Sequence, residues 1–333
     1  MNILNLLTNK DRIDYSESYQ YKKDFKTTVL FPQRKTENMK VAIARLVENG
    51  ALPVMANFHA LDAEAKIGDR TNYSVMDYEK LFIKEKLNQT ERILYFLNGT
   101  TDEDAIRDFI FDDFDNLVSR VLTRVELANC QVLSTGKLEI NENNYKTVVD
   151  FGYKSTHNVP LNAWADPEHS IIDDLNAVVE KAQVDGKKLT RALTSSKVVS
   201  YLVKNKEIKS FFVNSGRVLN SRLVLEWVYE NFGIAFETYD DVYKLSANDT
   251  TTHRFFPENK IAFFDGQGTL GAGLFGVTPE ELGLNEGVST SGLVTLTQWE
   301  TNDPVAVWSK ASAMYLPVIA DIDGLYIGTV SAS

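Results

Sequence analysis

The longest regular pattern of apolar positions runs from about Asp102 to Leu133 and predicts one long amphipathic helix. Apolar residues recur there at steps of three or four, the period of an α-helix, at Ile106, Ile110, Phe114, Leu117, Val121, Val125, Ala128 and Val132. Gly136 follows where a helix commonly ends. About 32 residues at about 1.5 Å each form a rod of about 48 Å. A compact domain of this chain length has a radius of gyration of about 20 Å, so the helix is expected to span nearly the whole subunit.

The chain before this helix consists of two segments that are not expected to fold alone. Residues 1–39 are polar and mixed in charge, and we interpret them as an arm that is ordered only against another surface. Residues 40–85 contain two extended runs, 40–56 and 73–83, separated by a polar tip. Because a lone two-stranded ribbon is only marginally stable in water, this segment is also expected to need a partner surface.

The chain after the helix predicts a β-hairpin and then a separate α/β unit. The hairpin pairs the strand-like runs 137–140 and 145–151. In residues 160–310, Asp166 and Pro167 are expected to begin the first helix. Further helical patterns lie at 196–205 and 220–232, and strand patterns lie at 234–239, 242–245, 260–264 and 315–330. The pattern as a whole predicts an α+β protein.

The composition is that of an ordinary globular protein, with 44% apolar and 24% charged residues in a chain of 333. No run of about 18 uncharged apolar residues exists, and the first residues lack the apolar core and cleavage site of a signal peptide. We therefore expect neither a membrane span nor secretion. A net charge of −11 argues against a protein that grips nucleic acid, since phosphate contacts need clustered Lys and Arg. The single cysteine and the four scattered histidines show no metal-ligand spacing, and no cofactor or metal is expected.

The glycine-rich segment Gly266–Gly273 matches a dinucleotide-binding fingerprint and follows the strand-like run 260–264. Its glycines should open a helix directly, yet the next residue able to begin one is Pro279, too distant to direct a helix N-terminus at a pyrophosphate. We therefore interpret the segment as a surface loop and keep a nucleotide-dependent enzyme as the alternative hypothesis.

Other polar clusters indicate packing and surface features. Asp112, Asp113 and Asp115 lie on the long helix, where a solvated face or pairing with a neighbouring subunit's Arg or Lys is favoured over a cation site. Cys130 is expected to be a buried small hydrophobic residue. The segment Asp321–Gly324 lacks the later ligands of a calcium loop and is interpreted as a turn. No motif of a common enzyme class is present, so we interpret the chain as structural and not as an enzyme.

The order of these parts resembles that of the major capsid proteins of tailed phages, which have the Hong Kong 97 fold. More specifically, the chain looks like the lambda-type capsid protein E family. The segments that carry the resemblance extend over nearly the whole chain: Leu30-Phe31-Pro32, Leu52-Pro53-Val54-Met55, Tyr145 to Gly152, Phe255-Phe256-Pro257, Ile261-Ala262-Phe263-Phe264 and Phe275-Gly276-Val277-Thr278-Pro279-Glu280.

The resemblance implies a Hong Kong 97-type α+β fold in five parts. Residues 1–39 would be the N-terminal arm, 40–85 an extended β-hairpin loop, 86–160 a peripheral domain with the long spine helix, 161–309 an α/β axial domain, and 310–333 a C-terminal strand returning to the peripheral domain. Candidate contacts between subunits lie at the tip of the extended loop: Asn57, Phe58, His59, Leu61, Lys66, Asp69 and Arg70.

The function implied by the resemblance is that of a structural major capsid protein in the virion, assembled in the host cytoplasm. The chain would form hexamers and pentamers of an icosahedral head that encloses double-stranded DNA without specific binding. The implied partners are a portal and a separate scaffolding protein, since no long helical N-terminal extension is present; a decoration protein is left open. Covalent cross-linking is not expected. A shell protein of an encapsulating compartment stays open as a further alternative.

Overall fold

The structure, a computed structural model, describes residues 25–47, 72–89, 103–142, 144–213, 219–266, 270–283, 292–303 and 305–331. The chain divides into two compact units, each made of segments far apart in the sequence. The first unit takes its described residues from 1–40, 79–130 and 271–320, and the second from 41–78, 131–270 and 321–333. The boundaries at residues 40–41 and 78–79 fall within the strands of a two-stranded ribbon, and the boundary at 130–131 falls within the long helix.

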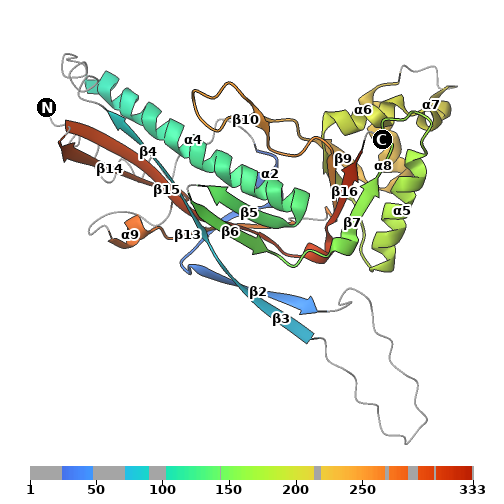
Figure 1. Ribbon diagram of the computed structural model, residues 1–333, viewed down its shortest axis with the longest axis horizontal. Helices are drawn as coiled ribbons and strands as arrows, with labels where there is room; N and C mark the ends of the chain where they lie inside the picture. The colour runs from blue at the N-terminus through green and yellow to red at the C-terminus, as the bar shows by residue number, and fades with distance from the viewer. Residues whose placement is uncertain are drawn as a thin grey trace, which may run out of the picture. The chain divides into compact units, whose positions relative to one another are not determined.

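The long helix predicted from the apolar period is α4, Glu103–Thr135, which is continuous over 33 residues (Figure 1). The predicted apolar stripe is buried wherever the structure describes its side chains, at Ile110, Phe114, Leu117, Val121, Val125, Ala128 and Val132. The helix ends as expected at Gly136, whose φ of 72° lies in the left-handed region that glycine tolerates best. The Gly136 N–H donates to the Val132 carbonyl at 2.8 Å, which satisfies one of the last helical carbonyls.

The first unit contains a five-stranded sheet built around β15, Val305–Ile319. β15 pairs antiparallel with β14 (Thr295–Asn302), β13 (Gly271–Gly276) and β4 (Leu81–Gln89), and β1 (Gln33–Thr36) pairs parallel with β13. The short helices α2, Thr27–Leu30, and α9, Pro279–Gly283, belong to the same unit. The sheet therefore joins segments from the beginning, the middle and the end of the chain.

One face of β15 carries small side chains beneath α4. Ser309, Ala311 and Ala313 are buried, and strand alternation places them on the same face as Tyr315. The Tyr315 hydroxyl donates to Asn129 of α4 at 2.6 Å, so this is the face that the helix covers. Small side chains at these positions leave room between helix and sheet for the bulky residues of the α4 stripe.

The second unit contains a five-stranded sheet in the order β7–β16–β12–β8–β9. The strands are β7 (Asn158–Leu161), β16 (Tyr326–Val330), β12 (Lys260–Phe264), β8 (Arg191–Thr194) and β9 (Ala235–Thr238). The two outer pairs are parallel, whereas β12 is antiparallel to both of its neighbours. Beside the sheet lie α5 (Ile171–Val184), α6 (Ser196–Lys204), α7 (Lys206–Phe212) and α8 (Ser221–Phe232) (Figure 1).

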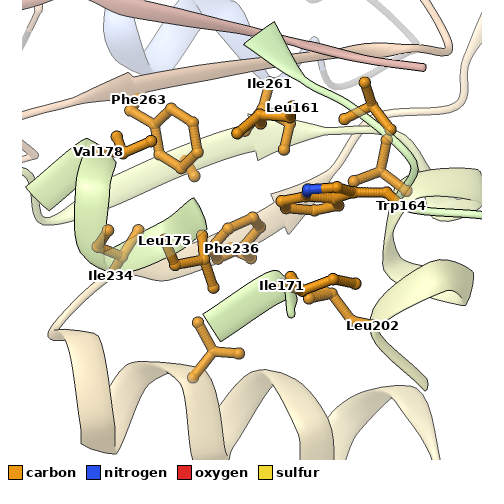
Figure 2. Close-up of a cluster of buried hydrophobic side chains, with 14 of the residues drawn as sticks. Leu161, Trp164, Ile171, Leu175, Val178, Leu202, Ile234, Phe236, Ile261 and Phe263 are labelled. Atoms are coloured by element: carbon orange, nitrogen blue, oxygen red, sulfur yellow. The ribbon is translucent and has the colours of Figure 1, made fainter. Parts of the chain in front are cut away.

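Side chains from this sheet and its helices form one apolar core (Figure 2). Trp164 is 1% exposed and donates its indole N–H to Asp174 at 2.7 Å, which satisfies its single polar atom. Phe236 of β9 meets Phe263 of β12 edge to face, with ring centroids 5.9 Å apart. Tyr326 and Val330 of β16 complete the core, so the end of the chain is built into the α/β unit.

Smaller elements follow the predicted pattern. The hairpin predicted after the long helix is present as β5 (Lys137–Glu142) paired antiparallel with β6 (Tyr145–Asp150). A second short ribbon pairs β10, Val242–Tyr243, with β11, His253–Arg254. The predicted helix at 220–232 ends at Gly233, whose φ of 71° again requires the left-handed region.

The helix expected to begin at Pro167 begins instead at Ile171, with Ser170 as its N-cap. The Ser170 hydroxyl accepts from the Asp173 N–H at 3.4 Å. The later start is explained by a contact with α7, because the Pro167 carbonyl accepts from the Lys206 N–H at 2.9 Å. A carbonyl engaged by a distant segment does not serve the first turn of a helix, and residues 166–169 form turns instead.

Two strand-like runs differ from expectation. The run 73–83 is two strands, β3 (Asn72–Glu79) and β4, which belong to different sheets. The run 315–330 is interrupted by the 3₁₀ turn η3, Ile322–Gly324, which confirms the predicted turn at 321–324. In each case the local pattern of apolar residues was correct and the tertiary pairing decided where an element ended.

Candidate functional site

The candidate contact residues at the predicted loop tip lie outside the part of the chain that the structure describes. These residues are Asn57, Phe58, His59, Leu61, Lys66, Asp69 and Arg70, and their role in contacts between subunits stays a prediction. The division of the chain into arm, loop, peripheral and axial domains also stays a prediction. The structure does describe the residues at which the loop leaves and rejoins the fold, and these residues carry an unusual buried group.

In the segment predicted to be an extended loop, the structure describes a two-stranded ribbon of β2, Lys40–Val47, and β3 (Figure 1). Among the described residues, no further strand pairs with either of them. Lys40 and Glu79, at the start of β2 and the end of β3, form an ion pair of 3.4 Å between exposed side chains. Such a pair contributes at most about 1 kcal/mol. The ribbon ends must therefore be fixed mainly by other contacts.

Lys80 follows the ribbon directly and is buried, with only 2% of its surface exposed. Its ammonium donates to the Thr36 hydroxyl at 2.6 Å, to the Thr36 carbonyl at 3.0 Å and to the Asn38 carbonyl at 2.6 Å. Its backbone N–H donates to the Met39 carbonyl at 3.1 Å. Burial lowers the pKa of the Lys80 ammonium. The three oxygen acceptors use all three donors of the ammonium and fix the point where β3 passes into β4.

A glycine makes room for this buried lysine. A Cβ at Gly276 of β13 would lie 2.8 Å from Cδ of Lys80 and 3.2 Å from its Nζ. The sequence contains a signal for Lys80 that the pattern analysis missed. Apolar residues stand at Tyr73 and Val75, then at Tyr78, and then at Leu81. The alternation shifts phase twice, which indicates a break in the strand near residue 80.

A buried polar network joins α2, α4 and β15 in the first unit. The Thr27 hydroxyl donates to Glu126 and accepts from the Asn129 side-chain amide at 2.9 Å. Asn129 in turn accepts from the Tyr315 hydroxyl at 2.6 Å. Burial raises the pKa of the Tyr315 hydroxyl, which stays protonated and donates. The members of this network are far apart in the sequence. The network therefore fixes where the described part of the N-terminal segment meets the long helix.

The residues of this network are also identifiable in retrospect. Glu126 stands on α4 with Leu122 four residues before it and Cys130 four residues after it, so it lies in line with apolar neighbours. An acidic residue in such a line indicates a buried polar contact. Cys130 is buried, as predicted, with its Sγ 3.9 Å from Glu126.

His157 in the second unit is buried against the last strand of the chain. It lies in the 3₁₀ turn η2, Ser155–His157, and its ring stacks on Tyr326 with centroids 4.4 Å apart. Its Nε2 lies 3.6 Å from the Asp185 carboxylate, which also accepts from the Tyr326 hydroxyl at 2.6 Å. Burial lowers the pKa of His157, and the nearby Asp185 carboxylate opposes this effect.

The other sequence candidates have structural roles. Asp112 is exposed, and Asp113 accepts from Gln89 at 3.2 Å. Burial raises the pKa of Asp113. Within the described residues, no group of three His, Cys, Asp or Glu side chains is arranged to hold a metal ion. In the turn at 321–324, Asp321 pairs with Lys187 at 2.6 Å and Asp323 pairs with Lys154 at 3.4 Å.

The glycine-rich segment is not the surface loop that we expected over its whole length. Gly271 and Gly273 lie in strand β13, and Gly268 lies outside the described residues. A Cβ at Gly271 would lie 1.9 Å from the Val318 carbonyl oxygen, so the glycine permits close approach of β15. A segment that continues as a paired strand does not open a helix toward a pyrophosphate, which argues against the nucleotide-site alternative.

Comparison with solved structures identifies the fold. A capsid protein of a prophage of E. coli CFT073 aligns with a TM-score of 0.62 and 16% identity over 99% of both chains. A phage-related protein from Bordetella bronchiseptica RB50 aligns with a TM-score of 0.55 and 13% identity, covering 95% of this chain and 94% of the other. The capsid protein of Myoviridae phage XM1 aligns with a TM-score of 0.50 and 10% identity, covering 95% of each chain. The fold is the predicted Hong Kong 97-type capsid fold.

The sequence then identifies the family. Residues 14–330 match the family described as Phage major capsid protein E, and the chain belongs to this family. It is therefore a structural capsid protein of the virion that associates with further copies of itself. No curated protein matches the chain. No helix among the described residues is long and apolar enough to cross a membrane.

Replacing Tyr315 with Phe removes the hydroxyl that donates to Asn129 and leaves a buried acceptor unsatisfied. We expect this variant to lose about 1–3 kcal/mol of unfolding free energy. The measurement is urea unfolding of the soluble subunit. Tyr145→Phe is the matched control, since Tyr145 is 55% exposed and its variant should stay within about 0.5 kcal/mol of the parent. Equal effects of the two changes would contradict a stabilising network around Tyr315.

The lowered pKa of His157 predicts a pH dependence of stability. The folded state favours the neutral imidazole, so the unfolded chain binds the proton more readily once the pH falls to about 6.5. Stability is therefore expected to decrease as the pH drops from 7.5 to 5, and His157→Phe should reduce this slope. The midpoint of urea unfolding, measured at several pH values in that range, gives this slope. His253→Gln on the short β11 is the control. If the His157→Phe variant kept the same slope of stability against pH, groups other than His157 would cause the loss of stability.

Proposed function

We propose that this capsid protein forms the hexamers and pentamers of an icosahedral head that encloses double-stranded DNA. The observation that carries the proposal is the ribbon of β2 and β3, which has no third strand among the described residues and begins and ends beside the buried Lys80. A two-stranded ribbon is marginally stable in water. A neighbouring copy that supplies a surface for it would account for its presence in the fold.

Contacts of this kind are heterologous, because the ribbon of one copy meets a different surface of the next. Heterologous contacts generate closed rings when the rotation between copies closes. We assign the loop tip, residues 57–70, to these contacts and propose that the loop reaches over the adjacent subunit. The ammonium of Lys80, with its three oxygen acceptors, would fix the residues between which the ribbon begins and ends.

The remaining partners follow from the same role. A net charge of −11 favours enclosure of DNA over tight binding, since like charges repel. We propose a separate scaffolding protein that directs curvature, a portal at one vertex, and assembly in the host cytoplasm. A decoration protein on the outer surface is compatible with this arrangement. None of these partners requires covalent cross-linking of the subunits.

Electron microscopy of the chain expressed with its scaffolding protein tests the proposal. We expect closed shells with icosahedral order and rings of five and six subunits. A subunit that stays monomeric under every condition of concentration, salt and scaffold would contradict it.

Deletion of Asn57–Asn72 should leave a folded, soluble subunit that forms no shells, because the buried apolar residues described for the two units lie outside this segment. Circular dichroism checks the fold, and electron microscopy counts shells. A matched variant in which the same residues are replaced by an equally long Gly/Ser segment separates side-chain contacts from loop length. Normal shells from the deletion variant would contradict the loop assignment.

A further inference from the structure

The second unit presents an apolar groove that the described residues leave open. The groove has a volume of about 520 Å³ and lies between α6, α8 and the strand β9. Its walls include Val199, Leu225, Tyr229 and Phe236, and Glu226 stands at its rim. Tyr229 is 57% exposed. Strand β9 is the last strand of its sheet among the described residues, so the groove follows a sheet edge.

The same unit presents an apolar projection on another element. Phe211 of α7 is 59% exposed, and Val213, directly after the helix, is 76% exposed. The Phe211 ring lies against Trp227 of α8 with centroids 5.3 Å apart. This contact holds the ring in one position while leaving most of it accessible. Two exposed apolar side chains two residues apart, one at the end of a short helix and one directly after it, are suited to insertion into a groove.

The groove and the projection lie on different sides of α8. Residues 222, 225, 226 and 229 face the groove, whereas Trp227 faces α7. Since successive helical residues are rotated by about 100°, these two sides are about 150° apart around the helix axis. The third side, with Val224 and Val228, is buried in the core. The two surfaces therefore do not overlap, and one copy can use both at the same time.

The charges around the two surfaces are complementary. Near the projection, Lys204 and Lys209 are exposed, and Lys206 pairs with Glu168. At the groove, Glu226 pairs with Arg222 at 2.8 Å and Glu230 is exposed one turn further along α8. Glu207 is the acidic residue near the projection and is engaged by the Ser170 hydroxyl at 2.9 Å. A net positive projection and a net negative groove favour this pairing over contact of like surfaces.

We infer that the groove between α6, α8 and β9 of one copy receives Phe211 and Val213 of the next copy around a capsomer ring. The inference rests on the proposed ring assembly and adds to it the two surfaces that meet. Each copy gives its projection to one neighbour and accepts that of the other, so the contact is heterologous and can close. Lys209 would then lie near Glu230 of the neighbouring copy.

Cysteine cross-linking in assembled shells tests the pairing directly. A variant with both Val213→Cys and Tyr229→Cys is expected to give a covalent ladder, from dimers up to pentamers and hexamers, on oxidation. The native Cys130 is buried and does not contribute. Each single variant should give no ladder, and shells from an equal mixture of the two single variants should give dimers and nothing larger.

The outcomes separate this inference from the proposed function. Shells of the double variant that form normally but give no ladder would overturn the pairing of groove and projection and leave the capsid assembly standing. Failure of the parent chain to form rings or shells would overturn the proposed assembly itself. A ladder in the double variant together with dimers in the mixture would establish both.

A charge exchange provides a second measurement. Lys209→Glu is expected to reduce the yield of shells at least about tenfold, and Glu230→Lys in the same chain should restore it, because each contact then has opposite charges again. Lys188→Glu, the same charge reversal at an exposed residue elsewhere in the unit, should change the yield of shells little. A yield that does not recover in the double variant would overturn the charge pairing.

Discussion

Burial of the apolar stripe of α4 against the small-residue face of β15 is the constraint on which the first unit depends. An amphipathic helix of 33 residues exposes a long apolar surface unless a sheet of comparable length covers it. β15, with fifteen residues at about 3.3 Å each, extends about 50 Å, similar to the helix. Strands β4 and β13 can join this sheet only where β15 already holds it in place. The glycines of β13 follow from the same constraint, because a Cβ at Gly271 would meet the β15 backbone.

Much of this arrangement was predictable because the signals are local. A stripe of apolar residues with period 3.6 specifies a helix wherever the helix is packed, and Gly136 marks its end through its own backbone conformation. The hairpin of β5 and β6 and the Gly233 stop have equally local causes. The tertiary partners of a strand have no such local signal, so the division of the run 73–83 between two sheets was missed. The glycine segment was interpreted as a surface loop for the related reason that glycines are common in loops, whereas the close approach of β15 that Gly271 permits leaves no local signal.

The candidate site was predictable only in part. The loop-tip residues were chosen from a resemblance, and their contacts would form between copies, which one chain does not contain. Lys80 and Glu126 were missed because charged residues are assigned to the surface by default. Each is buried at a junction of three segments, where its donors or acceptors are satisfied. The residues that meet at such a junction are about 40 to 190 positions apart in the sequence. A break in the apolar pattern at these positions was present, but it indicated where a contact occurs and not its partner.

These buried polar groups differ in kind from the surfaces proposed for assembly. An apolar surface can be covered by many partners, whereas the Lys80 ammonium and the Thr27–Asn129–Tyr315 network require specific acceptors and donors at fixed distances. The groups that fix geometry are thus inside the subunit, where each bond is made before assembly. The surfaces proposed for contact between copies are different in kind: a ribbon, an apolar groove and two exposed side chains, flanked by separate charges. Contacts of moderate strength of this type allow a misplaced subunit to dissociate, which a shell built from many identical copies requires if it is to close without defects.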